Sequence, residues 1–421
     1  MLKKLERLTP AEDAILSAAS QMEAGDARRR EAAALLRDQG LPTRRVEAWH
    51  YTDLRNTLKS FAPPASRPEA AAIAAFIDAD AAIAGAARVP FLDGVHLADN
   101  ADSLPEGVRL TRGAAASGWR HRSDTIAQLN TMFAGDGVRV AVDPGVNVRQ
   151  AIALVHGTST AASMALRHSV ELANGAEATF IEQHASADGI ASLSNTVTGL
   201  TLEEGAKAQW VIVQQEGDAA RHLAQLNVTL GKGAHLTILV LNAGGALVRR
   251  EINVVVRGEG SQLVIRGVNL IAGQSHIDVT TSLIHEVPDT VSSEIFRNVV
   301  LDQGRGVFQG EIRVAQAAQK TDARMACNTL LLSDEAEFSA KPELEIFADD
   351  VQCAHGATVA DIDPNHLFYL RARGIPEKLA RSLLVRAFVE EVFEEPVEKA
   401  GMEALGDNLV ERIENWLDRH G

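Results

Sequence analysis

Hydrophobic positions follow a helical spacing at the two ends of the chain and a strand-like pattern between them. Near the N-terminus, residues 14–23 (AILSAASQME) and 28–39 (RRREAAALLRDQ) place alanine and leucine at helical spacing, and Gly40 with Pro42 supplies a stop signal. Helical spacing returns after Pro364. We therefore expect helices at both ends of the chain.

The middle of the chain consists of short runs rich in valine, isoleucine, leucine and threonine, such as ATFIEQH, HLTILVLN and EINVVVR. Such runs are typical of β-strands. No proline occurs between Pro144 and Pro288, which favours an uninterrupted hydrogen-bonded sheet. Amphipathic helices do not separate the runs, so a doubly wound α/β fold is disfavoured. We expect a mainly β core.

A weak repeat runs through this core. The segments LANGAEATF, LEEGAKAQW, LGKGAHLTI and RGEGSQLVI each place a glycine before a β-type run, and these glycines are 30, 28 and 27 residues apart. A near-regular period of this size indicates stacked units that bury their apolar faces against one another. It favours a parallel β-solenoid, and a β-sandwich with coincidental turn glycines stays open. In a solenoid the glycines lie at equivalent corners: Gly175, Gly205, Gly233 and Gly260.

The segment IPEKLARSLLVRAFVEEVF predicts a C-terminal amphipathic helix that Pro396 ends. A second amphipathic segment, NLVERIENWLD, closes the chain. The first helix either packs on the β core or presents its stripe to a partner. The predicted apolar stripe consists of Leu379, Leu383, Leu384, Ala387, Phe388 and Val392.

These changes of pattern predict three domains. Residues 1–115 form an N-terminal helical domain that includes the Pro/Ala-rich linker FAPPASRPEAAAIAAF. Residues 116–362 form the β core, and residues 363–421 form a C-terminal helical domain.

Composition narrows the function. The 41 basic and 56 acidic side chains give a net charge of −15, the wrong sign for a nucleic-acid-binding protein. The start, MLKKLERLTPAED, has no apolar stretch typical of a signal peptide, and no run of 18 apolar residues predicts a membrane span. Two cysteines, Cys327 and Cys353, make no disulfide framework. We expect a reduced, cytoplasmic protein that binds neither nucleic acid nor membranes.

Signatures of a self-sufficient enzyme do not occur in the sequence. Gly231-Lys232 lacks the upstream glycine of a phosphate loop, and HEVPD at 285–289 has Asp289 where a zincin has its second histidine. Neither GxSxG nor GxGxxG is present. The 13 histidines are scattered, and we expect residues such as His222 and His235 at the surface or in turns. The chain is predicted not to be an enzyme.

One segment carries candidate chemistry, Cys353-Ala-His355. In a strand, residues i and i+2 share a face, so a thiolate and an imidazole would lie side by side. Both suit iron and other transition metals, but two ligands do not complete a site. The alternative is a buried thiol beside a hydrogen-bonded histidine. Cys327 has no such neighbour and is predicted to be inert.

An acidic run precedes this segment. We interpret it as the solvent-exposed edge of a strand. The alternative is that these carboxylates assist the delivery of a metal ion. Its residues are Glu343, Glu345, Asp349 and Asp350.

The distal part of the chain resembles the SufB/SufD family of the SUF iron–sulfur cluster assembly system. The resemblance lies in GVFQGEIRV, NTLLLSDEAEFSAKPELEIFADDVQCAHGATV, LFYLRARGI and ARSLLVRAFVEEV. LPTRRVEAWHYTDLR near the N-terminus is similar to the block typical of the SufD branch, and the small number of cysteines agrees with that branch. Residues 120–300 resemble the family in their general pattern of short β-type runs more than in specific motifs.

The resemblance implies a right-handed parallel β-helix between two helical domains. It implies a scaffold subunit that pairs with a SufB-like paralogue and with a SufC-like ABC ATPase. The ATP-binding residues would then belong to the ATPase. A nascent iron–sulfur cluster or iron would be held transiently at the interface with the paralogue, with His355 as the metal-binding residue and Cys353 assisting. The C-terminal domain would dock the ATPase, through or beside Leu379, Leu383, Leu384 and Phe388.

Two other functions stay open at this point. One is a β-helix carbohydrate lyase or hydrolase, although such enzymes are usually exported and stack sugars on aromatic residues, which make up only 4% of this chain. The other is a homodimeric scaffold that acts without a paralogue. Co-purification with an ABC-type ATPase would separate the SUF function from the lyase.

Overall fold

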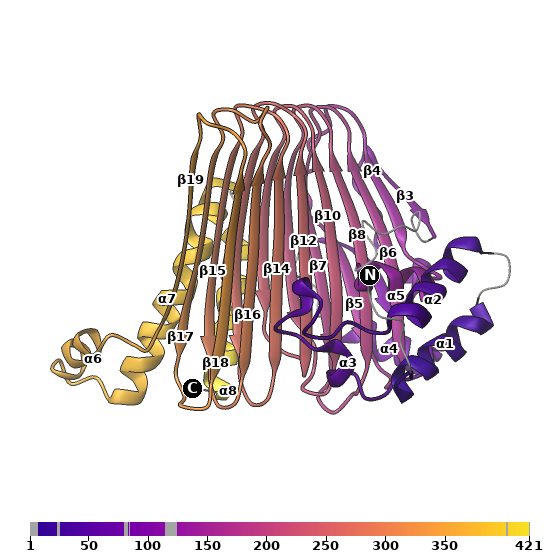
Figure 1. Ribbon diagram of the computed structural model, residues 1–421, viewed down its shortest axis with the longest axis horizontal. Coiled ribbons are helices and arrows are strands. Elements are labelled where there is room, and N and C mark those ends of the chain that lie inside the picture. The colour runs from indigo at the N-terminus through magenta and orange to yellow at the C-terminus, as the bar shows by residue number, and fades with distance from the viewer. Residues whose placement is uncertain are drawn as a thin grey trace.

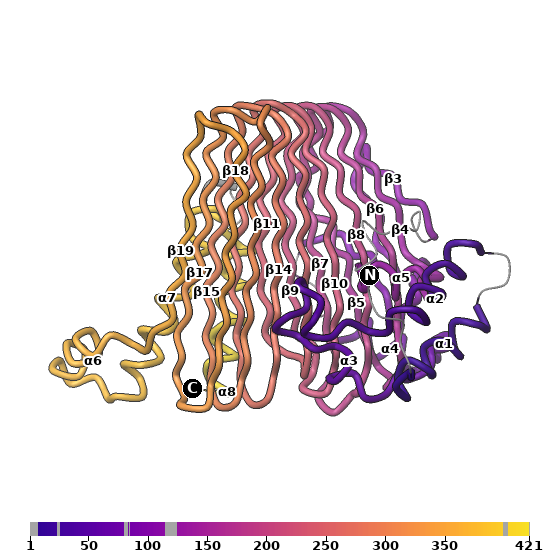
Figure 2. Tube along the Cα trace, in the orientation of Figure 1, coloured from indigo at the N-terminus to yellow at the C-terminus, as the bar shows by residue number. Residues whose placement is uncertain are grey.

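Two β-sheets packed face to face form a flattened solenoid, with helices on its outer faces (Figures 1 and 2). This computed structural model describes residues 7–22, 26–79, 83, 85–113, 124–400 and 403–420. From residue 138 on, strands of the two sheets alternate along the chain, so each coil contributes one strand to each sheet. The prediction of a parallel β-solenoid flanked by helical regions is confirmed, and the sandwich alternative is wrong.

Neighbouring strands are parallel in both sheets except at the N-terminal end, where β1 pairs with β2 and β3 with β4 in antiparallel fashion. The ten-stranded sheet contains, in chain order, β1 (Ala87–Leu92), β2 (Val95–His96), β5 (Ile152–Thr158), β7 (Glu177–Ser186), β9 (Lys207–Gln215), β11 (His235–Asn242), β13 (Gln262–Ile271), β15 (Val291–Val300), β17 (Asp322–Leu331) and β19 (Gln352–Ala360). The nine-stranded sheet contains β3 (Val108–Arg112), β4 (Val138–Val142), β6 (Ser163–Leu172), β8 (Leu193–Leu202), β10 (Arg221–Leu230), β12 (Leu247–Val256), β14 (His276–His285), β16 (Arg305–Val314) and β18 (Glu337–Ile346).

The predicted corner glycines occupy equivalent turns. Gly175, Gly205, Gly233 and Gly260 have φ between 60° and 73°, a region that favours glycine over other residues. The backbone N–H of Gly175 donates to Glu204 of the next corner, and Gly205 donates to Lys232 in the same way. The 27–30-residue repeat is therefore the length of one coil.

The core lies between the two sheets. Alternate residues of each strand point inward and form one continuous apolar cluster from Val89 to Ala348. The outward residues of the ten-stranded sheet form a second cluster with the C-terminal helices. Outward residues of β8, β10 and β12, in the middle of the nine-stranded sheet, form a third cluster with the N-terminal helices. Both faces of each sheet thus bury apolar residues, as parallel sheets require.

The C-terminal helices are α6 (Pro364–Arg371), α7 (Glu377–Ala400) and α8 (Glu403–His420). Helices α7 and α8 lie along the ten-stranded sheet, whereas α6 projects from the end of the solenoid (Figure 1). The prediction that Pro396 ends the helix is wrong, because α7 continues through it to Ala400. A proline in a helix interior removes one backbone hydrogen bond, and here the packing of the long helix on the sheet outweighs that loss.

The buried stripe of α7 also differs from the predicted one. The residues packed against the sheet are Val385, Val389, Val392, Phe393 and Val397, whereas Leu379 and Leu383 are 51% and 39% exposed and Ala387 is exposed. Leu384 and Phe388 lie at the margin, half-buried. The pattern alone could not orient the helix because apolar residues occur on more than one of its sides.

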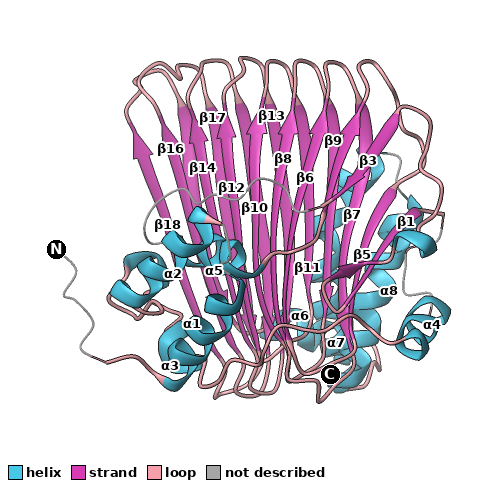
Figure 3. Cartoon of the chain, turned by 90° about the vertical axis from the view of Figure 1, so that its right-hand side faces the viewer, coloured by secondary structure: helices cyan, strands magenta, loops and turns pink. Residues whose placement is uncertain are grey.

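The N-terminal region contributes helices and strands. The helices are α1 (Pro10–Met22), α2 (Ala27–Gln39), α3 (Leu54–Thr57) and α4 (Ala70–Asp78), with short 3-10 turns η1 (Glu47–Trp49) and η2 (Ala98–Asn100), and α5 (Thr125–Phe133) follows β3. Helices α1, α2 and α5 pack on the nine-stranded sheet (Figure 3).

The predicted boundary at residues 115 and 116 lies outside the described residues. On either side of it, the chain mixes helix and strand: β1 to β3 precede it and belong to the sheets, and α5 follows it. The sequence pattern did not predict β1 because this strand contains Pro90, which cannot donate a backbone hydrogen bond. The proline is tolerated because β1 lies next to the edge of its sheet, with only the two-residue strand β2 beyond it.

The block EAWHYTDLR fixes the N-terminal region to the middle of the nine-stranded sheet. The guanidinium of Arg249 on β12 lies 4.6 Å from the ring of buried Trp49 and donates to the carbonyl of Ala48 at 2.8 Å. The same guanidinium pairs with Asp278 on β14, which also accepts from the hydroxyl of Thr52. Among the described residues, no helix combines the length and apolar character needed to cross a bilayer.

Candidate functional site

Strands β18 and β19 end the two sheets, and we call this edge of the solenoid the open end. Each is the last strand of its sheet, with a neighbour on one side only: β16 for β18 and β17 for β19. Pro342 and the charged side chains of β18 are typical of an exposed edge strand.

Cys353 and His355 lie on β19 at the open end. Their partners in the parallel register are Ala323 and Met325 of β17, which belong to the buried core. Residues in register point to the same face of a sheet, so Cys353 and His355 point toward the solenoid interior. Because no further coil covers them, Cys353 is only half-buried and His355 is exposed.

The two side chains differ in their surroundings. Partial burial raises the pKa of the Cys353 thiol; the backbone N–H of Ala323 opposes the shift, and the charge of Asp322 adds to it. The thiol is therefore protonated at neutral pH, rather than the thiolate that the sequence suggested, and must lose its proton to bind a metal. Within the described part of the chain, the His355 ring has no hydrogen-bond partner.

The open end supplies two donors and not a complete site. No group of three or more His, Cys, Asp or Glu side chains that could hold a metal occurs among the described residues. Any metal bound at His355 therefore needs ligands from outside this arrangement.

The structure places Cys327 in the core. Its side chain is fully buried on β17, and the amide of Asn298 donates to Sγ at 3.3 Å. Burial raises the pKa of this thiol to about 12, against a smaller lowering by Asn298. A neutral, enclosed thiol is unreactive, in agreement with the prediction.

The acidic run lies at the solvated edge of the nine-stranded sheet. Glu343 pairs with Lys341 at 3.0 Å, and Glu345 lies 3.7 Å from Arg313. Asp349 and Asp350 are exposed in the turn between β18 and β19. Exposed ion pairs of this kind are typical of a protein surface.

A buried cluster near the other end of the solenoid was missed by sequence reasoning. We call it the histidine cluster. His222, predicted at the surface, is fully buried in it, and the prediction is wrong; His235 is half-buried at the start of β11. The cluster consists of His156, His168, His184, His222, Glu182, Glu216 and Arg250.

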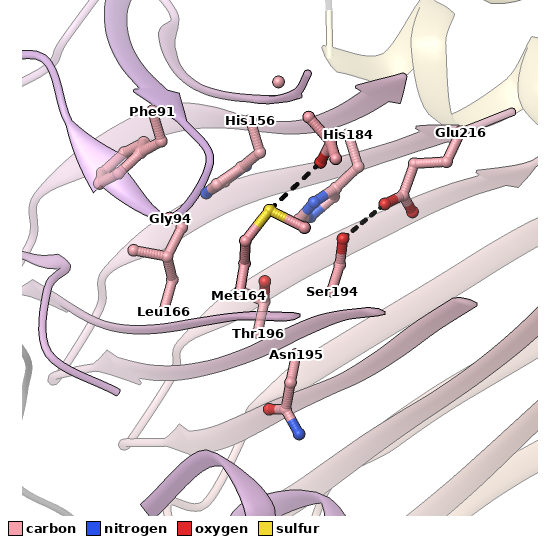
Figure 4. A pocket seen from close by; sticks show the side chains of 12 residues that line it. Phe91, Gly94, His156, Met164, Leu166, His184, Ser194, Asn195, Thr196 and Glu216 are labelled. Atoms are coloured by element: carbon pink, nitrogen blue, oxygen red, sulfur yellow. Dashed lines mark hydrogen bonds between the residues drawn. The ribbon is translucent and has the colours of Figure 1, made fainter. Parts of the chain in front are cut away.

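The imidazoles of the cluster touch one another. The rings of His156 and His184 stack with centroids 4.3 Å apart, and His222 meets His184 edge-on at 4.6 Å (Figure 4 shows the first pair). Beside them is a cavity of about 20 Å³, room for a single water molecule. Ser194 and Glu216 also line it, and the hydroxyl of Ser194 donates to Glu216 at 2.7 Å.

Hydrogen bonds define the tautomers of three histidines. The backbone N–H of Val138 donates to His168 Nδ1, so His168 Nε2 carries the proton and donates to His156 Nε2 at 3.1 Å. His156 Nδ1 then donates to the carbonyl of Gln183 at 3.0 Å. The guanidinium of Arg250 donates to His222 Nε2, so the proton of His222 is on Nδ1, which lies 2.7 Å from a carboxylate oxygen of Glu216.

The acid–base states agree with these bonds. Burial lowers the pKa of His168 and His222 to about 4, so both are neutral at pH 7. Burial would raise the pKa of Glu216, but His222 and the Ser194 hydroxyl hold it at about 2. Glu182, which accepts from His184 at 2.9 Å, also has a lowered pKa. Each imidazole of the cluster contacts another ring or a charged or polar group, which is typical of a buried structural network.

A polar row continues from this cluster toward the open end. Asn242 donates to Asn269 at 2.8 Å, Asn269 to Asn298 at 2.7 Å and Asn298 to Thr329 at 3.0 Å. The sequence signal was polar residues at inward-facing positions, but their alignment needs the strand register. In register the row is His156, His184, Gln214, Asn242, Asn269, Asn298 and Thr329.

Comparison with known proteins assigns the family. Residues 155–388 match the model of the SufBD core domain of SUF system FeS cluster assembly. The chain is 31% identical to the iron–sulfur cluster assembly protein SufD of Escherichia coli K12 over 380 residues, 84% of this chain and 85% of that protein. A SufBD family protein of Synechocystis is 26% identical over 87% of this chain and 86% of its own length. The chain belongs to the SufB/SufD family of the SUF iron–sulfur cluster assembly system, in its SufD branch.

Proposed function

We propose that this chain is a cytoplasmic, non-catalytic scaffold subunit of a cluster-assembly complex, and that the open end is where the nascent cluster or iron is held. The observation that carries the proposal is the inward-facing pair of half-buried Cys353 and exposed His355 at an edge that no further coil covers. Family membership supports the role in iron–sulfur cluster assembly.

The partner at the open end is a SufB-like paralogue. The edges of β18 and β19 carry backbone N–H and C=O groups that another strand can pair with. A thiolate from the paralogue would complete the ligand set that His355 begins, since this chain supplies too few donors. Iron and the cluster are the cargo of this interface, held transiently.

The ATPase partner binds the projecting segment at the start of the C-terminal domain. Phe368 and Tyr369 on α6 are 73% and 55% exposed, and Leu379 and Leu383 on α7 are exposed beside them in sequence. Several large apolar side chains exposed on two consecutive helices are typical of an interaction site. Leu384 and Phe388 contribute from the margin, where Phe388 packs on Arg297.

The decisive experiment reconstitutes cluster assembly anaerobically with the chain, the paralogue and the ATPase. His355→Ala is expected to leave the complex intact and abolish cluster formation, measured by visible absorbance. His366→Ala, at an exposed histidine on α6, should have only a mild effect on cluster formation. Because α6 belongs to the proposed docking segment, retention of the ATPase by this variant is checked by pull-down. Normal assembly with His355→Ala would refute the assignment of His355. Assembly by the chain without the paralogue would favour the homodimeric scaffold.

A further inference from the structure

Glu294 is a buried carboxylic acid that the proposed function does not use. It lies on β15 and is 1% exposed. The hydroxyl of Thr281, on β14 of the opposite sheet, donates to its Oε2 at 2.8 Å, while Oε1 has no hydrogen-bond partner among the described residues. A polar atom buried without a partner is unfavourable, and a charged one is more unfavourable still. The fold therefore favours the neutral carboxyl at this position.

Glu294 interrupts an apolar row of the core. The strand register places it between Ile265 of β13 and Met325 of β17. The same register continues the row from β5 to β19, and between β5 and β17 every other member is apolar. The coil that contains β15 thus differs from its neighbours by an ionisable group in the core. In register the row is Ile152, Phe180, Trp210, Ile238, Ile265, Glu294, Met325 and His355.

The titratable groups around Glu294 are neutral or engaged elsewhere. The Cys327 thiol on β17 and the His285 imidazole on β14, whose pKa burial lowers to about 4, are both uncharged at pH 7. Strands β13 and β16 place no titratable side chain on their inward faces. Arg250 on β12 faces the carboxylates of the histidine cluster. Among the described residues, Glu294 therefore has no cation to balance a negative charge.

The acidity of Glu294 follows from this environment. Burial raises its pKa from the ordinary 4.5 to about 7, and the Thr281 hydroxyl opposes the shift. Between these two values the folded chain keeps the proton and the unfolded chain has lost it. The contribution of Glu294 to stability is therefore complete below pH 4.5 and is lost as the pH rises to 7.

The coil of Glu294 lies close to the open end. Only β17 separates β15 from β19, the last strand of the sheet. The last coil of a solenoid contacts one neighbour instead of two, so the end of the stack opens more easily than its middle. A weakened contact in the core beside this end is therefore expressed as local opening there.

We propose that Glu294 is a pH-sensitive element that weakens the packing of the last coils as the pH rises toward 7. The neutral carboxyl is accommodated in the core. Its ionisation releases a proton to solvent and leaves an unbalanced carboxylate, which favours the opening of β15 and β17 to water. The opening extends to β19, which hydrogen-bonds to β17 and carries Cys353 and His355. The proposal does not require metal binding at His355.

Hydrogen exchange of the full-length chain tests the proposal, measured by mass spectrometry at pH 5.5 and 7.5 and corrected for the intrinsic exchange rate. For the amides of β15 and β17, the ratio of opening in the unmodified chain to opening in Glu294→Gln should rise about twentyfold between the two pH values. The amides of β7 and β9, several coils away, should show no such rise. Comparison with the variant cancels the titration of His285, whose effect has the opposite sign.

Two further variants complete the test. Thr281→Val removes the hydroxyl that opposes the raised pKa, so the increase in opening should extend to a higher pH; this variant decides the test if Glu294→Gln does not fold. Glu259→Gln, at an exposed carboxylate in the turn before β13, is the matched control and should behave as the unmodified chain. Equal pH dependence in the unmodified chain and Glu294→Gln would overturn the proposal. An unchanged profile in Thr281→Val, or a rise of equal size in every coil, would overturn it too.

Discussion

Histidines occur on the same inward face of the ten-stranded sheet at both ends of the solenoid, with opposite surroundings. His156 and His184 on β5 and β7 are enclosed by neighbouring coils and by β1, and their rings are stacked and buried. His355 on β19 has the same orientation, but no coil follows it, and its ring is exposed. The comparison teaches that position in the stack, and not the residue type, decides whether a histidine here is structural or available to a ligand.

The largest expected effect is the loss of folding stability at acidic pH, caused by the buried histidine cluster. Unfolded histidines take up protons near pH 6.5, whereas folded His168 and His222 do so only near 4. Their stabilising contribution is therefore complete above pH 6.5 and is lost as the pH falls toward 4, at up to about 3 kcal/mol for each group. Glu216, with a folded pKa of about 2 against an ordinary 4.5, adds a further loss below pH 4.5.

Chemical denaturation between pH 7.5 and 4 measures this loss. His222→Gln should make the profile less steep because one of the buried imidazoles with a lowered pKa is gone. A profile that is flat in the unmodified chain would contradict the neutral state assigned to the histidine cluster.

Arg250→Met should cause the next largest effect. It removes the guanidinium that bonds His222 and Asn242 and faces two buried carboxylates, so we expect a loss of about 3–5 kcal/mol in the free energy of unfolding. Arg257→Met is the control: Arg257 is 61% exposed beside Glu286, and its loss should change stability by less than about 1 kcal/mol. Similar losses for both variants would mean that the cluster is no more stabilising than a surface pair.

His184→Ala and His355→Ala test the comparison directly. His184→Ala leaves Glu182 without its imidazole partner and opens a cavity, so the free energy of unfolding should fall by about 2–4 kcal/mol. His355→Ala should stay within about 0.5 kcal/mol of the unmodified chain. Urea denaturation measures both. Equal destabilisation by the two substitutions would remove the distinction between the two ends.

The smallest effect on stability is expected for Leu379→Ser with Leu383→Ser. Both side chains are exposed, so unfolding should be unchanged within about 0.5 kcal/mol, while capture of the ATPase in a pull-down should be lost. Phe393→Ala, on the buried face of the same helix, should instead destabilise by about 3–5 kcal/mol. Undiminished ATPase capture by the double variant would place the docking surface elsewhere. Point variants are preferable to deleting the domain, because α7 and α8 cover an apolar sheet face.

Much of the architecture followed from local pattern. The glycine repeat identified the corners because positive φ selects glycine, and the β-type runs predicted the strands. The candidate pair Cys353 and His355 was also recognisable, because residues two apart on a strand share a face. Strand β1 and the continuation of α7 beyond Pro396 were not predicted, because each contains a proline, which is unfavourable in both kinds of element. In the folded chain, tertiary packing outweighs the unfavourable effect of these prolines.

The sequence by itself determined the coil length, the mainly β core and the family motifs, because these depend on local conformational preferences and short spacings. Only the tertiary structure decided which polar residues meet. His156 and His168 come from two strands, and Glu294 and His355 are 61 residues apart in the chain numbering, aligned only by register. Register is set by the summed packing of every coil, and burial follows from whether another coil is present. For this reason the sequence wrongly placed buried His222 at the surface. The exposure of His355 follows from its position on the last strand of its sheet, which only the tertiary structure shows.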